Sequence, residues 1–187
     1  MDSSLAPICV NNGRALFSPE LPVAKLHAKL NPAGISNVVG MKLTCGFVGK
    51  ITRLAAQHRP EEFSIFGGQS DFLIGGLAAG SAGCIAAFSD VFPKLTAEIY
   101  RLYKAGELDE AMRLQRVAAL VESLCKSGIA TTKFVVAHYS AKLAGIQDAE
   151  PKFRPRHPYE EPGEVAKQAV RTVMAEASAI EQQLQKV

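Results

Sequence analysis

The 187-residue sequence lacks several features that would assign it to a specialised class of protein. It has no CxxC pair and no histidine at metal-ligand spacing from a cysteine. Its four cysteines lie 36, 39 and 41 residues apart, which is typical of reduced core thiols. The 21 basic and 18 acidic residues form no block of one sign, so we expect no nucleic-acid partner and no binding to a membrane surface.

Long hydrophobic runs are also missing. The most apolar stretch, Leu73 to Ala87, is interrupted by glycines and does not read as a membrane span. The N-terminus has no basic region followed by an apolar segment, which argues against a secretory signal. From these absences we expect a cytoplasmic protein.

The first half of the chain alternates short apolar segments with helical patterns. Strands are predicted over Ser36–Leu43, Phe63–Phe66 and Gly83–Phe88, with helices over Lys50–His58 and Phe72–Ala79 between them. This order is typical of βα units that feed a parallel sheet.

The second half is predicted to be helical. After a short helix over Ser18–Leu30 and the βα units, four longer helices are predicted: Lys94–Ala105, Leu108–Lys126, Thr131–Leu143 and Glu164–Lys186. We therefore divide the chain into an N-terminal segment (1–35), a βα region (36–93) and a C-terminal helical region (94–187).

Lys42 interrupts the apolar strand segment that ends at Leu43. An ammonium group is costly to place there unless it is paired or takes part in chemistry. Partial desolvation disfavours the charged form of a lysine, and the free amine attacks carbonyl groups. Lys42 is therefore a candidate Schiff-base residue. The alternative is a lysine that reaches solvent from the strand end or pairs with a carboxylate.

Four segments around and after Lys42 form a larger pattern. They are Gly40-Met-Lys-Leu-Thr-Cys-Gly46, Phe66-Gly-Gly-Gln-Ser-Asp71, Leu77–Ala86 with Val91-Phe-Pro93, and Ile99–Met112 with Arg154-Pro155. In this order they resemble segments of the dihydrodipicolinate synthase and N-acetylneuraminate lyase family of class I pyruvate aldolases. The resemblance implies an α/β fold: a partial TIM (β/α)8 barrel of about the last three βα units, followed by C-terminal helices.

The resemblance also implies a site. Lys42 corresponds to the Schiff-base lysine, Gly68 lies near the substrate-binding mouth, and Ile85 presents its backbone carbonyl to the site. Thr44 points to the same face as Lys42 if the strand alternation continues, and could then bind substrate. The alternatives are an ordinary loop threonine at Thr44 and a turn glycine at Gly68. The lysine would attack the ketone of pyruvate or another 2-keto acid, and the iminium would accept electrons as a carbon–carbon bond forms or breaks. The family implies no metal and no organic cofactor, a small-molecule substrate and a homo-oligomer. The segment Lys42-Leu-Thr-Cys45 most resembles the branch of the family that includes 2-keto-3-deoxy-galactonate and 4-hydroxy-2-oxoglutarate aldolases.

Two segments of the family have no counterpart here: the Gly-Thr-Thr-Gly-Glu segment that grips the pyruvate carboxylate, and the Tyr-Asn-x-Pro segment that supplies a proton-shuttling tyrosine. A complete (β/α)8 barrel needs roughly 250 residues. An alternative hypothesis is therefore a catalytically incompetent truncated fragment or pseudoenzyme that associates with itself or with a full-length relative. A third is an unrelated βα protein that binds a phosphate-bearing ligand at Gly67-Gly68, although no nucleotide-binding glycine fingerprint is present.

Overall fold

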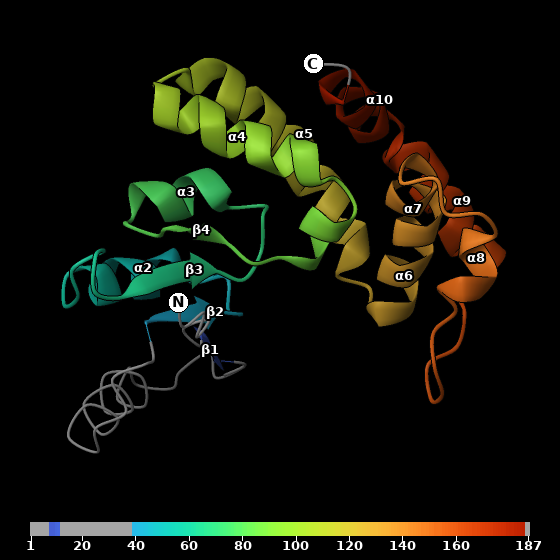
Figure 1. The fold of residues 1–187 in the computed structure, drawn as a ribbon, viewed down its shortest axis with the longest axis horizontal. Helices are drawn as coiled ribbons and strands as arrows, with labels where there is room; N and C mark the ends of the chain where they lie inside the picture. The colour runs from blue at the N-terminus through green and yellow to red at the C-terminus, as the bar shows by residue number, and fades with distance from the viewer. Residues whose placement is uncertain (1–7, 12–38, 186–187) are drawn as a thin grey trace, which may run out of the picture. The chain divides into compact units, whose positions relative to one another are not determined.

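A computed structural model of the chain describes residues 8–11, as backbone only, and residues 39–185 (Figure 1). The chain divides into two compact units, Met1–Ile85 and Ala86–Val187. Among their described residues, the first unit contains a parallel sheet with two helices, and the second is helical. The helix predicted over Ser18–Leu30 lies outside the described residues.

The sheet of the first unit has four parallel strands in the order of the sequence. Lys42 is paired with Val10 on one side and with Phe66 on the other, and Phe66 is paired in turn with Gly83. The elements are β1 (Ile8–Asn11), β2 (Gly40–Leu43), α2 (Val48–Ala55), β3 (Ser64–Gly67), α3 (Leu73–Ala78) and β4 (Gly83–Cys84). The predicted alternation of parallel strands and helices is confirmed.

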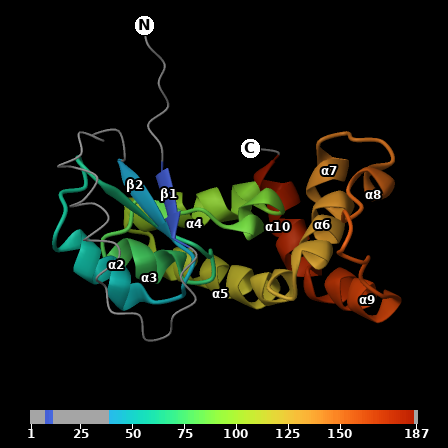
Figure 2. The ribbon, with the colours of Figure 1, turned by 90° about the horizontal axis from the view of Figure 1, so that it is seen from below.

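Alternation along the strands explains how the helices cover the sheet. Met41 and Leu43 are 3% and 2% exposed and pack with Ile51 and Leu54 of α2. Because successive side chains of a strand point to opposite faces, the residues between them face away from this core. Helices α2 and α3 contact each other and lie side by side against the sheet (Figure 2).

The strand predictions differ from the structure at both ends of the sheet. β1 was not predicted, because four residues are too few to show a periodicity. The strand predicted over Gly83–Phe88 is wrong beyond Cys84, since the chain forms a 3₁₀ helix, η1 (Ala87–Asp90), that buries Phe88 in the second unit. An apolar run does not by itself distinguish a strand from a buried turn of helix.

The second unit contains seven further helices among its described residues. They are α4 (Pro93–Ala105), α5 (Leu108–Cys125), α6 (Ile129–His138), α7 (Ser140–Leu143), α8 (Ala149–Lys152), α9 (Glu164–Val173) and α10 (Ala175–Leu184). The first two match the predicted helices closely. Each of the last two predicted helices is instead a pair, broken at Tyr139 (φ −110°, ψ −80°) and at Met174. Amphipathic periodicity continues across both breaks, so the sequence does not reveal them.

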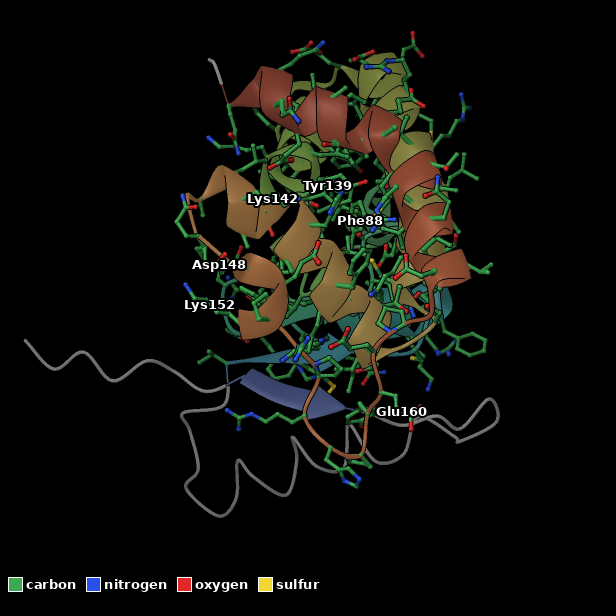
Figure 3. The ribbon with its side chains drawn as sticks, turned by 90° about the vertical axis from the view of Figure 1, so that its right-hand side faces the viewer. Phe88, Tyr139, Lys142, Asp148, Lys152 and Glu160 are labelled. Atoms are coloured by element: carbon green, nitrogen blue, oxygen red, sulfur yellow. The ribbon has the colours of Figure 1, made fainter. Side chains whose placement is uncertain are left out.

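Buried side chains link the helices of this unit. The ring of Phe92 lies 5.5 Å from that of Phe88 and 5.4 Å from that of Tyr139, and Figure 3 labels both outer rings. Glu181 of α10 is 0% exposed and accepts hydrogen bonds from the backbone N–H groups of Lys94 (2.9 Å) and Leu95 (2.7 Å). These N–H groups have no partner within α4 because they belong to its first turn. Glu181 of α10 therefore caps the N-terminus of α4.

Candidate active site

Lys42 occupies the third position of β2, one residue before the strand ends. Its neighbours Met41 and Leu43 face the core beneath α2, so the Lys42 side chain lies on the opposite face of the sheet, where it is half-buried. In a parallel sheet, ligand sites gather at the carboxyl ends of the strands. Lys42 is therefore in the right part of the sheet to meet a substrate.

The same face of the sheet carries two apolar side chains beside Lys42. Phe66 is the register partner of Lys42 on β3 and is half-buried. Gly83 is the next partner, and a Cβ built on it would lie 3.9 Å from Cδ1 of Phe66. Ile85 follows two residues later, donates its backbone N–H to the carbonyl of Gly67 at 2.8 Å, and is 38% exposed. Lys42, Phe66 and Gly83 therefore form a row across three strands, and Ile85 follows Gly83 by two residues, just beyond the end of β4.

The sequence did not identify Phe66 as a site residue. It is the last apolar residue of a predicted strand, but its position beside Lys42 depends on the register of β2 against β3. A one-residue change of register would place it on the other face. The strand pattern alone carries no such information.

The loops after β2 and β3 touch at the carboxyl edge of the sheet. A Cβ built on Gly68 would lie 2.4 Å from the Leu43 carbonyl oxygen and 2.6 Å from Cα of Thr44. Thr44 itself is exposed. The structure therefore brings Thr44 and Gly68 together, directly after the strand residues that flank Lys42, and the absence of a side chain at Gly68 permits this contact.

A second lysine follows β2 at the carboxyl edge of the sheet. Lys50 lies in the first turn of α2, and its Nζ is 5.8 Å from the centre of the Phe47 ring. Phe47 precedes the helix and is 43% exposed. Within residues 39–185, neither Lys42 nor Lys50 forms an ion pair with a carboxylate.

The structure shows no metal centre in the part of the chain that it describes. No group of three or more His, Cys, Asp or Glu side chains is arranged to hold a metal ion there. Cys45 and Cys84 are half-buried thiols, and Cys125 is buried. Burial, with a smaller contribution from Glu122, raises the pKa of Cys125 to about 12, so this thiol is unreactive at neutral pH.

His138 packs against aromatic and basic side chains of the second unit. Its ring stacks on Phe134 at 5.7 Å, and its Nδ1 accepts a hydrogen bond from Nζ of Lys142, which Figure 3 labels, at 3.3 Å. Burial lowers the pKa of His138, and the charges of Lys142 and Arg171 lower it further, against an opposing effect of Glu150. The neutral imidazole is therefore favoured in the folded protein.

No described helix is long and apolar enough to cross a membrane.

Two fungal relatives resemble the chain over most of its length. A Coccidioides immitis protein, provisionally named a mitochondrial 4-hydroxy-2-oxoglutarate aldolase, is 68% identical over 154 residues, which are 82% of this chain and 48% of the relative. An Emericella nidulans protein with the corresponding name is 35% identical over 191 residues, 98% of this chain and 56% of the relative. The chain thus spans about half the length of these relatives.

The names of these relatives correct one expectation. We expected a cytoplasmic protein, and that expectation is wrong, because both fungal relatives are named as mitochondrial proteins. The reasoning rested on the missing secretory signal and membrane span. Both features concern export and membrane insertion, and neither distinguishes the cytoplasm from the interior of an organelle.

Solved structures show the same relationship. The crystal structure of a dihydrodipicolinate synthase family protein from Coccidioides immitis matches with a TM-score of 0.85 and 57% identity, over 96% of this chain and 56% of that one. The structural relatives are TIM-barrel proteins, which agrees with the α/β class of the first unit. The sequence pattern of the Dihydrodipicolinate synthetase family matches residues 20–177. The chain therefore belongs to the dihydrodipicolinate synthetase family.

Proposed function

We propose that this chain carries the Schiff-base lysine of an aldolase that acts on a 2-keto acid. The observation that carries the proposal is the position of Lys42: half-buried, beside Phe66, and at the carboxyl end of a parallel strand. A lysine at this end of a strand can add its amine to the ketone of a bound 2-keto acid. We also infer that the four-stranded sheet is part of a TIM barrel, in agreement with the fold of the structural relatives.

The proposed reaction begins when the amine of Lys42 adds to the substrate ketone and water leaves, forming an iminium. A base removes the proton of the 4-hydroxyl group and the C3–C4 bond breaks. The former C4 leaves as the carbonyl carbon of an aldehyde, which is glyoxylate if the substrate is 4-hydroxy-2-oxoglutarate, and the electron pair of the bond moves into the iminium to give an enamine. Protonation and hydrolysis then release pyruvate and restore the amine. Thr44 would donate a hydrogen bond to the substrate, Gly68 would leave room for it, and the Ile85 carbonyl would accept a hydrogen bond from it.

The names of the fungal relatives favour 4-hydroxy-2-oxoglutarate as the substrate and the mitochondrion as the location. Another relative, from Hypocrea jecorina, is an L-threo-3-deoxy-hexylosonate aldolase and is 37% identical over 111 residues. All three relatives are named as aldolases, but the names give two different substrates. They therefore support an aldolase reaction on a 2-keto acid more strongly than they support one particular substrate. Assembly into a homo-oligomer stays a prediction.

A coupled assay tests the proposal. The purified chain is mixed with 4-hydroxy-2-oxoglutarate, and the pyruvate released is measured with lactate dehydrogenase. We expect activity that Lys42→Arg abolishes, because a guanidinium stays protonated and cannot attack a carbonyl. Lys104→Arg, a change on α4 in the second unit, should keep full activity.

The second candidate function is the incompetent fragment that associates with itself or with a full-length relative. The relatives are named as aldolases, and these names do not favour this candidate over the enzyme. A cooperatively folded chain that releases no pyruvate, and that elutes from size exclusion as an assembly, would support this candidate over the enzyme.

A further inference from the structure

The neighbour of Lys42 on the adjacent strand is Phe66. The two residues are register partners of the parallel strands β2 and β3. Both side chains are half-buried, whereas Met41 and Ile65, one residue earlier on each strand, are each 3% exposed in the core beneath α2. Lys42 and Phe66 therefore lie on the same face of the sheet. Adjacent strands are about 4.8 Å apart, so the Phe66 ring is within contact distance of the aliphatic stem of Lys42.

Gly83 leaves room for the ring on its other side. Gly83 is the register partner of Phe66 on β4, and a Cβ built on it would lie 3.9 Å from Cδ1 of Phe66. An aromatic side chain beside a glycine of the next strand packs over the backbone that the glycine leaves uncovered. The Phe66 ring therefore has a defined place between β2 and β4, with backbone on one side and the lysine stem on the other.

The amine of Lys42 extends past the ring instead of lying over it. Elsewhere in the chain an ammonium group does lie over an aromatic ring, since Nζ of Lys104 is 5.9 Å from the centre of the Tyr100 ring. In the part of the chain that the structure describes, Lys42 and Phe66 form no such pair. The ring is therefore a neighbour of the lysine methylene groups and does not occupy the reactive nitrogen.

A Schiff-base lysine has to hold its amine in line with a ketone. The reacting atoms must approach to about 3 to 3.5 Å with their orbitals aligned. A lysine side chain has many rotamers, and it loses more conformational entropy than most side chains when one of them is selected. A ring beside the stem removes the rotamers that bend across β3, so part of this ordering is in place before a substrate binds.

We propose that Phe66 is a positioning residue for Lys42: its ring, seated over Gly83, restricts the lysine stem and keeps the amine directed toward the carboxyl end of the sheet. Phe66 contacts the lysine and not the reacting atoms, so it acts through Lys42. The assignment rests on the proposed function, because it assumes that Lys42 forms the Schiff base.

Trapping kinetics test the assignment. The purified chain is incubated with increasing concentrations of pyruvate and a fixed concentration of cyanoborohydride, and the modified fraction of Lys42 is measured over time by peptide mapping. In Phe66→Ala the maximal trapping rate should fall about tenfold, because a freely moving amine reaches the reactive geometry less often. The pyruvate concentration at half-maximal rate should change less than about twofold, since the ring contacts the lysine and not the substrate.

A second reagent distinguishes positioning from a change in fold. Formaldehyde with cyanoborohydride methylates amines without a bound orientation, so methylation of Lys42 should be no slower in Phe66→Ala than in the unchanged chain. Phe66→Leu keeps an apolar side chain beside the stem and should restore at least about half of the maximal trapping rate. Phe47→Ala is the matched control, because it removes an equal ring that is 43% exposed at the start of α2, and it should leave trapping unchanged.

A contact measurement on the unchanged chain does not depend on any variant. Nuclear Overhauser effects should connect the ring protons of Phe66 with the methylene protons of Lys42. Their absence, a maximal trapping rate that Phe66→Ala leaves intact, or equal slowing by both reagents overturns the role of Phe66 alone. If pyruvate does not modify Lys42 in the unchanged chain, the proposed function is overturned, and the assignment of Phe66 with it.

Discussion

Replacement of Gly68 by alanine should disturb both the stability of the first unit and the geometry beside Lys42. The new Cβ would lie 2.4 Å from the Leu43 carbonyl oxygen and 2.6 Å from Cα of Thr44. Atoms at these distances overlap, and both neighbours are backbone atoms, so no side-chain rotation can relieve the contact. The loop after β3 must therefore move away from the end of β2.

The magnitude follows from the cost of overpacking, which is typically 1 to 3 kcal/mol for an extra methylene in a well-packed site. We expect about 2 to 3 kcal/mol for Gly68→Ala, since the overlap is with backbone. With an m-value of roughly 2 kcal/mol per M in urea, the unfolding midpoint falls by roughly 1 M or more. Gly68 does not have a positive φ, so the cost arises from space and not from backbone conformation.

Urea unfolding followed by circular dichroism measures the loss, and the amide shifts of Leu43 and Thr44 report the displaced backbone. Gly75→Ala is the matched control. Gly75 lies within α3, where an added Cβ has only an ordinary contact at 3.9 Å with Val48, so this variant should gain about 0.4 to 1 kcal/mol. A loss below about 0.5 kcal/mol at Gly68, with unchanged Thr44 shifts, would refute the reasoning.

Three further predictions concern the second unit. Glu181→Ala removes two charge-assisted hydrogen bonds to the first turn of α4 and should lower the free energy of unfolding by about 3 kcal/mol, as measured by urea titration. The control Glu176→Ala, at an exposed site on the same helix, should change the free energy of unfolding by less than about 0.5 kcal/mol. Iodoacetamide at pH 8, with peptide mapping, should label Cys45 and spare Cys125 until the protein is unfolded; rapid labelling of Cys125 in the native protein would contradict its raised pKa. Because burial lowers the pKa of His138 below the unfolded value, the unfolded chain binds more protons there, so stability should decline as the pH falls from 7 through 6.5 toward 5. His138→Gln should reduce that slope, and an unchanged slope would show that His138 does not cause it.

The sequence predicted the helices and strands that have a regular spacing of apolar residues and a residue, such as glycine, that marks their end. The helix over Leu108–Cys125 repeats apolar residues over five turns, and Gly106, at φ +80°, ends the helix before it. The breaks at Tyr139 and Met174 could not be predicted, because the apolar pattern continues through both. They arise from packing within the second unit, which local sequence does not encode.

Part of the candidate site could also be predicted from local sequence. Lys42 stands out because a charge within an apolar strand is rare, and Gly68 because glycine marks close approach of backbone. Phe66 was missed since only the register of two strands places it beside Lys42.

The most direct test of the central claim is borohydride reduction of the chain in the presence of pyruvate, followed by intact-mass measurement and peptide mapping. The account predicts one stable pyruvate adduct per chain, located on Lys42, and no adduct in Lys42→Arg. An unmodified chain, in a preparation where a full-length relative is labelled, would contradict the claim that Lys42 forms a Schiff base here, and so would an adduct spread over surface lysines.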